Sequence, residues 1–317
     1  MGYKVLITED IEQEGKDYLK KAGYEIKLAD SIDEDNLVRE VNDYDAILTR
    51  VAIISERVLK AAKKLKVIGK FGVGVDTIDV EAATRLGIQV TNSAEANKNT
   101  VAEYTMGLVL ALAKNLILYD SELRDGNFGI RTTFGMDVQD KVLGIVGAGA
   151  IGKLVAKKAS LGFGMKVIEY RRHIEKLKSE KNAQVTNDLD YLLKNSDFVS
   201  LHVPLTQNTR HMIGKRELSL MKKSAFLINT ARGEVVDDDA LVHALSNGEI
   251  KGAAVDVYAG EVPAKDNPLF KLKNVIVSPH TAAHTREAMV RMSICPAIGI
   301  DEVLRGKKPS WPVNHIV

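Results

Sequence analysis

The sequence predicts an α/β protein built from two doubly wound domains, each with a parallel sheet. Short runs rich in Val and Ile alternate with longer amphipathic stretches along most of the chain, which is the pattern of strands joined by crossover helices. At 317 residues the chain also exceeds what one hydrophobic core usually fills. We therefore expect a first domain over 1–98, completed by 288–317, and a second domain over 99–287.

The first domain is expected to contain short apolar strands in one doubly wound sheet. The stretches between the strands have helical spacing of apolar residues, as in Glu12–Ala22 and Ser55–Ala62. This alternation favours parallel strands with helices between them. The expected strands are Lys4–Thr8, Glu25–Leu28, Ala46–Thr49, Val67–Lys70 and Gln89–Thr91.

The next segment, NTVAEYTMGLVLALAKNLILYDSELRDG, is mostly apolar and contains no proline. It predicts one extended helix that begins near Asn99 or Thr100. Beyond it, the runs VLGIVG, MKVIEY, FVSLHV, SAFLINT, GAAVDV and NVIVSP predict the strands of the second sheet. The stretch after His280 is helical again, and we expect Pro296 to bend or break that helix.

Composition and charge narrow the class of partner. Forty-four Lys and Arg against 42 Asp and Glu leave a net charge of +2, so no global field attracts nucleic acid or an anionic membrane. No apolar run approaches the roughly 20 residues of a transmembrane helix. The single cysteine, Cys295, forms no intrachain disulfide. No spacing of His, Cys and carboxylates indicates a metal site. We expect a cytoplasmic protein.

The stretch VLGIVGAGAIG predicts a dinucleotide site in the second domain. Gly147, Gly149 and Gly152 follow a buried strand and open a helix that begins with Ala150 and Ile151. The first glycine permits a tight turn, the second lets the backbone approach a pyrophosphate, and the third lets the helix pack on the strand. The phosphates would bind the free N–H groups at the start of the helix.

The end of the following strand, KVIEYRR, indicates which cofactor binds. An acid that binds the adenosine ribose usually stands about 20 residues after the glycine loop. Here Arg171 and Arg172 stand at the tip, while Glu169 shares a face with Arg171 but lies too early to reach the ribose. Because guanidinium groups match phosphate, the pair favours NADP(H), with NAD(H) as the alternative. A solvated surface is the other interpretation of these arginines.

Polar residues follow further strands of the second domain. A guanidinium can hold an anionic group, and an imidazole or a carboxylate can exchange protons with a ligand. Arg232 follows Ala225–Asn229, His280 follows Asn274–Ser278, and Glu261 follows GAAVDVY. Open parallel sheets bind ligands at these carboxyl ends. For each residue the plain alternative is a surface side chain or a satisfied polar group.

Two loops of the first domain are candidates for anion binding. In KFGVGVD, Val73 and Gly74 can turn backbone N–H groups toward a carboxylate, although a tight structural turn explains the glycines equally well. Arg50 follows the strand AILT, and a capping or salt-bridge role is its alternative. From the residues alone, ligand contact and these structural roles are both open for Arg50, Val73 and Gly74.

Over nearly the whole chain the sequence resembles the D-isomer-specific 2-hydroxyacid dehydrogenases. The resemblance rests on KFGVGVDTID, NTVAEYTMGLVLAL, GIVGAGAIG, LHVPLTQNTRHMI, LINTARGEVVDDDAL, GAAVDVYAGE and VSPHTAAHTREA, in the family's order. It implies a flavodoxin-like substrate domain, a Rossmann nucleotide-binding domain and a homodimer. The implied activity is hydride transfer between a nicotinamide cofactor and a small 2-keto or 2-hydroxy acid of the glyoxylate, hydroxypyruvate or 3-phosphoglycerate type.

The resemblance also implies roles for individual residues, and it favours contact with the substrate for Val73 and Gly74, with Arg50 as a further candidate. Arg232 would anchor the substrate, His280 would act as general acid and base, and Glu261 would hydrogen-bond the imidazole. Asp256 would line the cofactor, although it can instead brace a loop. The other residues implied to line the cofactor are His202, Pro204, Thr230 and Ala231.

Two departures from the family's pattern bear on the substrate. Ala94 and Ala282 stand where the family commonly has a proline and a glycine. These changes alter the shape of a pocket, so the identity of the substrate is not carried over from the family. A nicotinamide-binding regulator of the corepressor type, which shares this architecture, is the alternative function.

Overall fold

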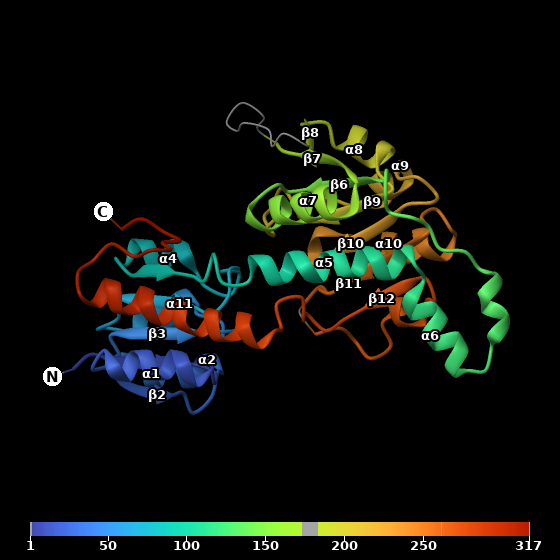
Figure 1. The fold of residues 1–317 in the computed structure, drawn as a ribbon. Coiled ribbons are helices and arrows are strands. Elements are labelled where there is room, and N and C mark those ends of the chain that lie inside the picture. The colour runs from blue at the N-terminus through green and yellow to red at the C-terminus, as the bar shows by residue number, and fades with distance from the viewer. Residues whose placement is uncertain (1, 173–182, 261, 317) are drawn as a thin grey trace. The chain divides into compact units, whose positions relative to one another are not determined.

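The computed structural model describes residues 2–172, 183–260 and 262–316. The chain forms two compact units, one of Met1–Asn97 with His284–Val317 and one of Lys98–Ala283. Each unit contains one parallel sheet with helices around it (Figure 1), which confirms the predicted fold class. The first unit is therefore built from two separate stretches of sequence, whereas the second is continuous.

The first unit contains a five-stranded parallel sheet in the order β2-β1-β3-β4-β5. Its inner strands are buried throughout or nearly so, as expected where helices cover both faces, whereas β2 is an exposed edge. Strand β1 ends slightly earlier than expected, at Ile7, and the other strands match their predicted bounds. The strands are β1 (Lys4–Ile7), β2 (Glu25–Leu28), β3 (Ala46–Thr49), β4 (Val67–Lys70) and β5 (Gln89–Thr91).

Side-chain caps begin several helices of the first unit. Ser55, Asp79 and Thr285 each accept a backbone N–H from the first turn of the helix that follows. Such caps satisfy donors that have no partner inside the helix. The helices are α1 (Gln13–Lys21), α2 (Glu34–Glu40), α3 (Glu56–Ala61), α4 (Val80–Arg85) and α11 (Arg286–Leu304), with the 3₁₀ segment η1 (Val41–Asp43).

Helix α11 packs tightly on the first sheet and runs through Pro296 without a break. A Cβ added to Gly69 of β4 would lie 2.9 Å from the Pro296 carbonyl oxygen, so glycine is needed there. Proline leaves the Met292 carbonyl without its usual helical donor. The Ser93 hydroxyl lies 3.3 Å from that oxygen, where it can donate instead, and also 3.1 Å from a β4 carbonyl. The freed carbonyl thus has a donor, and of the expected bend or break, the break does not occur.

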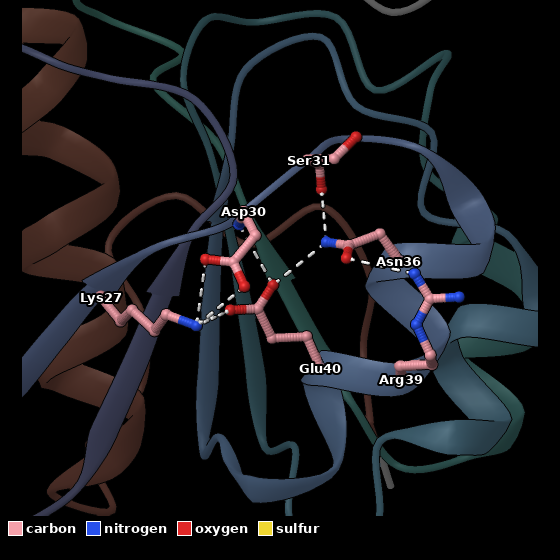
Figure 2. A network of polar contacts seen from close by, with 6 residues as sticks. All are labelled: Lys27, Asp30, Ser31, Asn36, Arg39 and Glu40. Carbon is pink, nitrogen blue, oxygen red and sulfur yellow. Dashed lines mark hydrogen bonds and ion pairs between the residues drawn. The ribbon is translucent and has the colours of Figure 1, made fainter.

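A polar network joins the end of β2 to α2 (Figure 2). The Glu40 carboxylate pairs with Lys27 Nζ at 2.5 Å, and it accepts the Asp30 N–H at 3.3 Å and Asn36 Nδ2 at 3.2 Å. Hydrogen bonding to Glu40 raises the pKa of Lys27. The network ties the exposed edge strand to the helix that follows it.

The residues after α11 cover the opposite edge of this sheet. Asn314 Oδ1 accepts the Val90 N–H at 2.7 Å and Gln89 Nε2 at 2.8 Å, and Asn314 Nδ2 donates to the Ile88 carbonyl at 2.9 Å. The Val313 N–H donates to the Val90 carbonyl at 2.8 Å. The backbone of β5, which would otherwise be an open edge, is thereby paired.

The second unit contains a seven-stranded parallel sheet in the order β12-β11-β10-β9-β6-β7-β8. Neighbours on β10, Leu227 and Ile228, belong to different core clusters, so apolar cores lie on both faces. Strand β8, a short and half-buried edge, is not among the predicted strands. The strands are β6 (Val142–Val146), β7 (Lys166–Tyr170), β8 (Ala183–Thr186), β9 (Phe198–Leu201), β10 (Phe226–Asn229), β11 (Gly252–Val255) and β12 (Val275–Val277).

The prediction of one extended helix at the start of the second unit is wrong. The segment divides into α5 (Lys98–Ala113) and α6 (Leu116–Arg124), which meet at 59°. Asn115 between them has φ +53°, a left-handed conformation that asparagine tolerates. Among the described residues no single helix is long and apolar enough to span a membrane, and this bent pair meets that test only by length and composition.

The remaining helical segments of the second unit lie between its strands. Gly149 is the N-cap of α7, and Asp188 and Asp237 cap α8 and α10 through their side chains. These segments are α7 (Ala150–Phe163), α8 (Leu189–Asn195), α9 (Lys215–Leu220) and α10 (Asp238–Ser246), with the 3₁₀ segments η2 (Phe128–Thr132), η3 (Gly233–Val235) and η4 (Pro268–Lys271).

Candidate active site

The glycine loop lies where the strand order of the second sheet reverses, between β6 and β9. Gly147 has φ +101°, and a Cβ there would lie 2.7 Å from the His202 carbonyl oxygen, while a Cβ at Gly152 would overlap the Gly147 carbonyl. Nothing lies within 4 Å of a Cβ built at Gly149, and Gly149 and Ala150 are exposed. The start of α7 therefore offers open backbone N–H groups that fit a pyrophosphate.

The two arginines after β7 occupy different environments. Arg171 is buried, and its Nε and Nη2 donate to Oε2 of Glu169 at 3.1 Å and 2.5 Å. Glu169 is fully buried. Arg172 is exposed. The sequence suggests that both arginines bind one phosphate. In the structure the charge of Arg171 is paired with the Glu169 carboxylate, whereas Arg172 is exposed.

His202 follows β9 and lies beside the glycine loop. Its Nε2 is 2.9 Å from Ser200 Oγ. Desolvation lowers the pKa of His202 to about 4, so the imidazole is neutral near pH 7. The exposed Pro204 follows, and its carbonyl accepts the Thr209 hydroxyl at 2.7 Å. This stretch therefore adds polar groups beside the loop without adding charge.

Asn229, the last residue of β10, shapes the loop that carries Arg232. Its Oδ1 accepts the Ala231 N–H at 3.1 Å, and its Nδ2 donates to the Arg232 carbonyl at 2.9 Å. Arg232 Nη1 donates to the Ala231 carbonyl at 2.7 Å. Thr230 Oγ1 lies 3.3 Å from Thr105 Oγ1 of α5. Asn229 is absent from the residues expected from the sequence, although its place at a strand end was a usable signal.

Asp256 joins the ends of β11 and β12. It is fully buried, and its Oδ1 accepts the Ser278 hydroxyl at 2.6 Å and the Thr281 N–H at 2.9 Å. Its Oδ2 accepts the Ala282 N–H at 2.9 Å. The contact with the cofactor expected for Asp256 stays a prediction. The loop after β12 takes up its acceptor oxygens, so Asp256 braces that loop.

His280 lies within the loop that Asp256 braces. Its N–H donates to the Asp256 carbonyl at 2.7 Å, and its backbone has φ +54°. Non-glycine residues keep this conformation only where their surroundings fix it, and such positions often belong to functional sites. The side chain is half-buried. Glu261, the expected partner of the imidazole, lies outside the described residues.

Arg50, Val73 and Gly74 follow β3 and β4 in the first unit. The Arg50 guanidinium lies 5.3 Å from the centroid of the Phe71 ring. Asn92 Nδ2 donates to the Val73 carbonyl at 2.8 Å and fixes the glycine-rich turn. Within the described ranges the N–H groups of Val73 and Gly74 bond no acceptor. Two successive open N–H groups are suited to an anion.

Known sequences are similar to this chain over almost its full length. A family model described as "D-isomer specific 2-hydroxyacid dehydrogenase, NAD binding domain" matches residues 106–282. The D-3-phosphoglycerate dehydrogenase of Methanocaldococcus jannaschii is 41% identical over 313 residues, which are 98% of this chain and 59% of that protein. The glyoxylate reductase of Thermococcus litoralis is 40% identical over 325 residues, which cover 99% of this chain and 97% of that protein. The chain thus spans about three fifths of the first relative.

Solved structures share the fold. The D-lactate dehydrogenase from Aquifex aeolicus, complexed with NAD and lactic acid, has a TM-score of 0.87 and 31% identity, covering 99% of this chain and 100% of that chain. An acyclic imino acid reductase in complex with NADPH and D-Arg has a TM-score of 0.88 and 28% identity, covering 98% and 100%. Both nicotinamide cofactors therefore occur in proteins of this fold.

Proposed function

The chain belongs to the D-isomer-specific 2-hydroxyacid dehydrogenase family, and on that premise we propose that it transfers a hydride between a nicotinamide cofactor and a small 2-keto or 2-hydroxy acid. Glyoxylate, hydroxypyruvate and the 3-phosphoglycerate type are the candidate substrates. The names of the two sequence relatives fit this range. Neither relative is a regulator of the corepressor type, so that alternative has no support from them.

One arrangement in the second unit carries the proposal. All its strands are parallel, so their carboxyl ends meet at one edge of the sheet, where open sheets of this kind bind ligands. That edge carries the glycine loop after β6, Arg232 after β10 and His280 after β12. A loop that fits a pyrophosphate, a cation and an imidazole thus follow strands of the same sheet.

These residues suit the steps of the reaction. The Arg232 guanidinium can hold a substrate carboxylate through two parallel hydrogen bonds and polarise the neighbouring keto oxygen. His280 would give its proton to the new alkoxide in reduction and take the hydroxyl proton in oxidation. We assign Glu261 the role of orienting the imidazole. The nicotinamide supplies or accepts the hydride when it is bound.

For the cofactor we propose a preference for NADP(H) that depends on Arg172. Arg172 is exposed just beyond β7, where the adenosine ribose of a dinucleotide is expected. Its planar guanidinium suits a 2′-phosphate. The charge of Arg171 is matched by Glu169, and the same pairing withdraws Glu169 from ribose binding. NAD(H) is the alternative.

We also propose a homodimer that buries the apolar side chains on and after α6. Monomeric proteins rarely leave many large apolar side chains together in solvent. Light scattering should give twice the chain mass of 34.7 kDa, and Phe134→Ser should weaken association. A wild-type monomer at micromolar concentration would contradict the proposal. The side chains concerned are between 54% and 83% exposed, namely Leu116, Ile117, Leu123, Phe128 and Phe134.

Turnover on a panel of 2-keto acids tests the proposed activity. Oxidation of NADPH and NADH is followed by absorbance with glyoxylate, hydroxypyruvate and phosphohydroxypyruvate. We expect at least one acid to drive oxidation, and His280→Gln to lower kcat by roughly a hundredfold or more with little change in cofactor affinity. His243→Gln, a change at an exposed histidine, is the matched control. Failure of every acid with both cofactors would favour the regulator.

A further inference from the structure

Glu9, directly after β1, holds the loop that carries Arg50. Its Oε2 accepts the Arg50 N–H at 3.0 Å, and its Oε1 accepts the N–H groups of Val51 and Ala52 at 2.6 Å each. The Thr8 hydroxyl also donates to this carboxylate. Successive backbone N–H groups that converge in this way form an anion-binding concavity. Here the anion that occupies it is the protein's own side chain.

A second charged residue holds the other side of Arg50. Lys70, the last residue of β4, is buried, and its Nζ donates to the Arg50 carbonyl oxygen. The N–H of Arg50 is thus bonded to the negative charge of Glu9 and its carbonyl to the positive charge of Lys70. These two residues belong to the strands on either side of β3, or directly follow them. The guanidinium in turn lies over the Phe71 ring, a favourable cation–π arrangement. The backbone of Arg50 is fixed before any ligand binds.

The position of this loop in the sheet is favourable for ligand binding. In the order β2-β1-β3-β4-β5, the direction of winding reverses between β1 and β3. Open parallel sheets bind ligands beside such a reversal, at the carboxyl ends of the strands. Glu9 follows β1 and Arg50 follows β3, so both stand at the reversal. In the same loop, the apolar residues Val51 and Ile53 are 51% and 64% exposed.

We infer that Glu9 is a positioning residue that presets the Arg50 guanidinium for the anionic group of the substrate. The inference rests on the proposed function, in which Arg50 contacts an acid. A cation held in place loses less conformational entropy when an ion pair forms, so affinity rises. Because Glu9 fills the converging N–H groups of this loop, Arg50 offers the substrate its side chain rather than its backbone.

Steady-state kinetics of matched variants tests this role. Glu9→Gln keeps the size of the side chain but removes its charge and places an NH₂ group against a backbone donor. It should raise KM for the 2-keto acid roughly tenfold, because charge-assisted hydrogen bonds to the loop are lost, with kcat and the cofactor Kd nearly unchanged. Glu9→Asp, which keeps the carboxylate, should recover part of the loss. Asp10→Asn, at an exposed neighbour bonded to Lys16, is the control.

The Arg50→Ala background separates positioning from a general effect on folding. If Glu9 acts through Arg50, Glu9→Gln should have little further effect on KM once the guanidinium is gone. An equal rise in KM in both backgrounds, or a wild-type KM for Glu9→Gln, would overturn the inference while leaving the proposed function intact. Absence of turnover by the wild-type protein would instead overturn the proposed function, and this role of Glu9 with it.

Discussion

Glu169 and Arg171 form a buried ion pair at the end of β7, with side chains that are 0% and 6% exposed. Nε and Nη2 of Arg171 both donate to the same carboxylate oxygen, Oε2 of Glu169. Among the described residues, Glu169 Oε1 and Arg171 Nη1 have no hydrogen-bond partner. The pair therefore has balanced charge but incompletely satisfied polar atoms, and each charge depends on the other.

Removal of one charge from this pair should destabilise the second unit. Glu169→Gln leaves a buried guanidinium without its counter-charge, and we expect it to lower the free energy of unfolding by roughly 3 kcal/mol. Urea denaturation measures the loss. The double variant Glu169→Leu/Arg171→Met should recover much of it, because no buried charge remains. Asp120→Asn, which breaks an exposed ion pair with Arg124, should change stability little. If Glu169→Gln and Asp120→Asn lowered the free energy of unfolding equally, that result would argue against a special role of the buried pair.

Arg172 should discriminate between the two nicotinamide cofactors. Arg172→Ala should raise the Kd for NADPH roughly tenfold or more, because a charge-assisted contact with the 2′-phosphate is lost. The Kd for NADH should not change. Fluorescence titration of the reduced cofactors gives both constants, and Arg210→Ala, at another exposed arginine, is the control. A parallel loss of affinity for both cofactors would contradict a role in reading the phosphate.

His202 should make stability dependent on pH below neutrality. Its pKa falls from 6.5 to about 4 on folding, so the unfolded chain binds the proton more strongly. The contribution is fully present above about pH 6.5 and is lost as pH falls toward 4. The free energy of unfolding should fall between pH 7 and pH 4.5, and His202→Gln should make that fall smaller by about 2 kcal/mol. His243→Gln should retain the wild-type difference, and an unchanged profile for His202→Gln would refute the prediction.

Asp256 should affect the chemical step and not cofactor binding. Asp256→Asn keeps the size of the side chain but turns an NH₂ group toward donors of the loop that carries His280. A displaced general acid should lower kcat by roughly tenfold or more. The cofactor Kd should stay close to that of the wild type, because the carboxylate faces the loop. Asp239→Asn, at an exposed position, is the control. Weaker cofactor binding with an unchanged kcat would favour the contact with the cofactor expected from the sequence.

Local patterns were sufficient to predict most of the fold. Buried runs of Val, Ile and Leu predict the strands because a parallel sheet covered on both faces leaves no polar alternation. The turn at Asn115 was missed, although the polar pair Lys114-Asn115 interrupts the apolar stretch and asparagine is a helix-end signal. Strand β8, with the sequence AQVT, is a half-buried edge and lacks the run of buried apolar residues that marks the inner strands. The donor for the Met292 carbonyl beside Pro296 comes from Ser93, which is distant in sequence and cannot be seen in a local pattern.

The candidate site was predictable where chemistry coincides with a strand end. Arg232 and His280 each follow a strand, so topology alone brings them to one edge of the sheet. The pairing of Glu169 with Arg171 follows from strand alternation, but its burial does not, because burial depends on the surrounding chain. The contacts of Glu9 link residues more than 40 positions apart. No local sequence motif predicts such a contact, because it forms only when β1 and β3 lie side by side in the sheet.

The divided first unit has a consequence for synthesis on the ribosome. Residues 2–97 emerge early, but α11 and Asn314, which complete their sheet, emerge only after the second unit. The continuous segment Lys98–Ala283 can fold in the meantime, since domains generally fold as units during translation. Until α11 and Asn314 have emerged, the nascent first sheet keeps one uncovered face beside Gly69 and an unpaired β5. That interval is when the chain is most open to pairing with a neighbouring nascent chain and most in need of a chaperone.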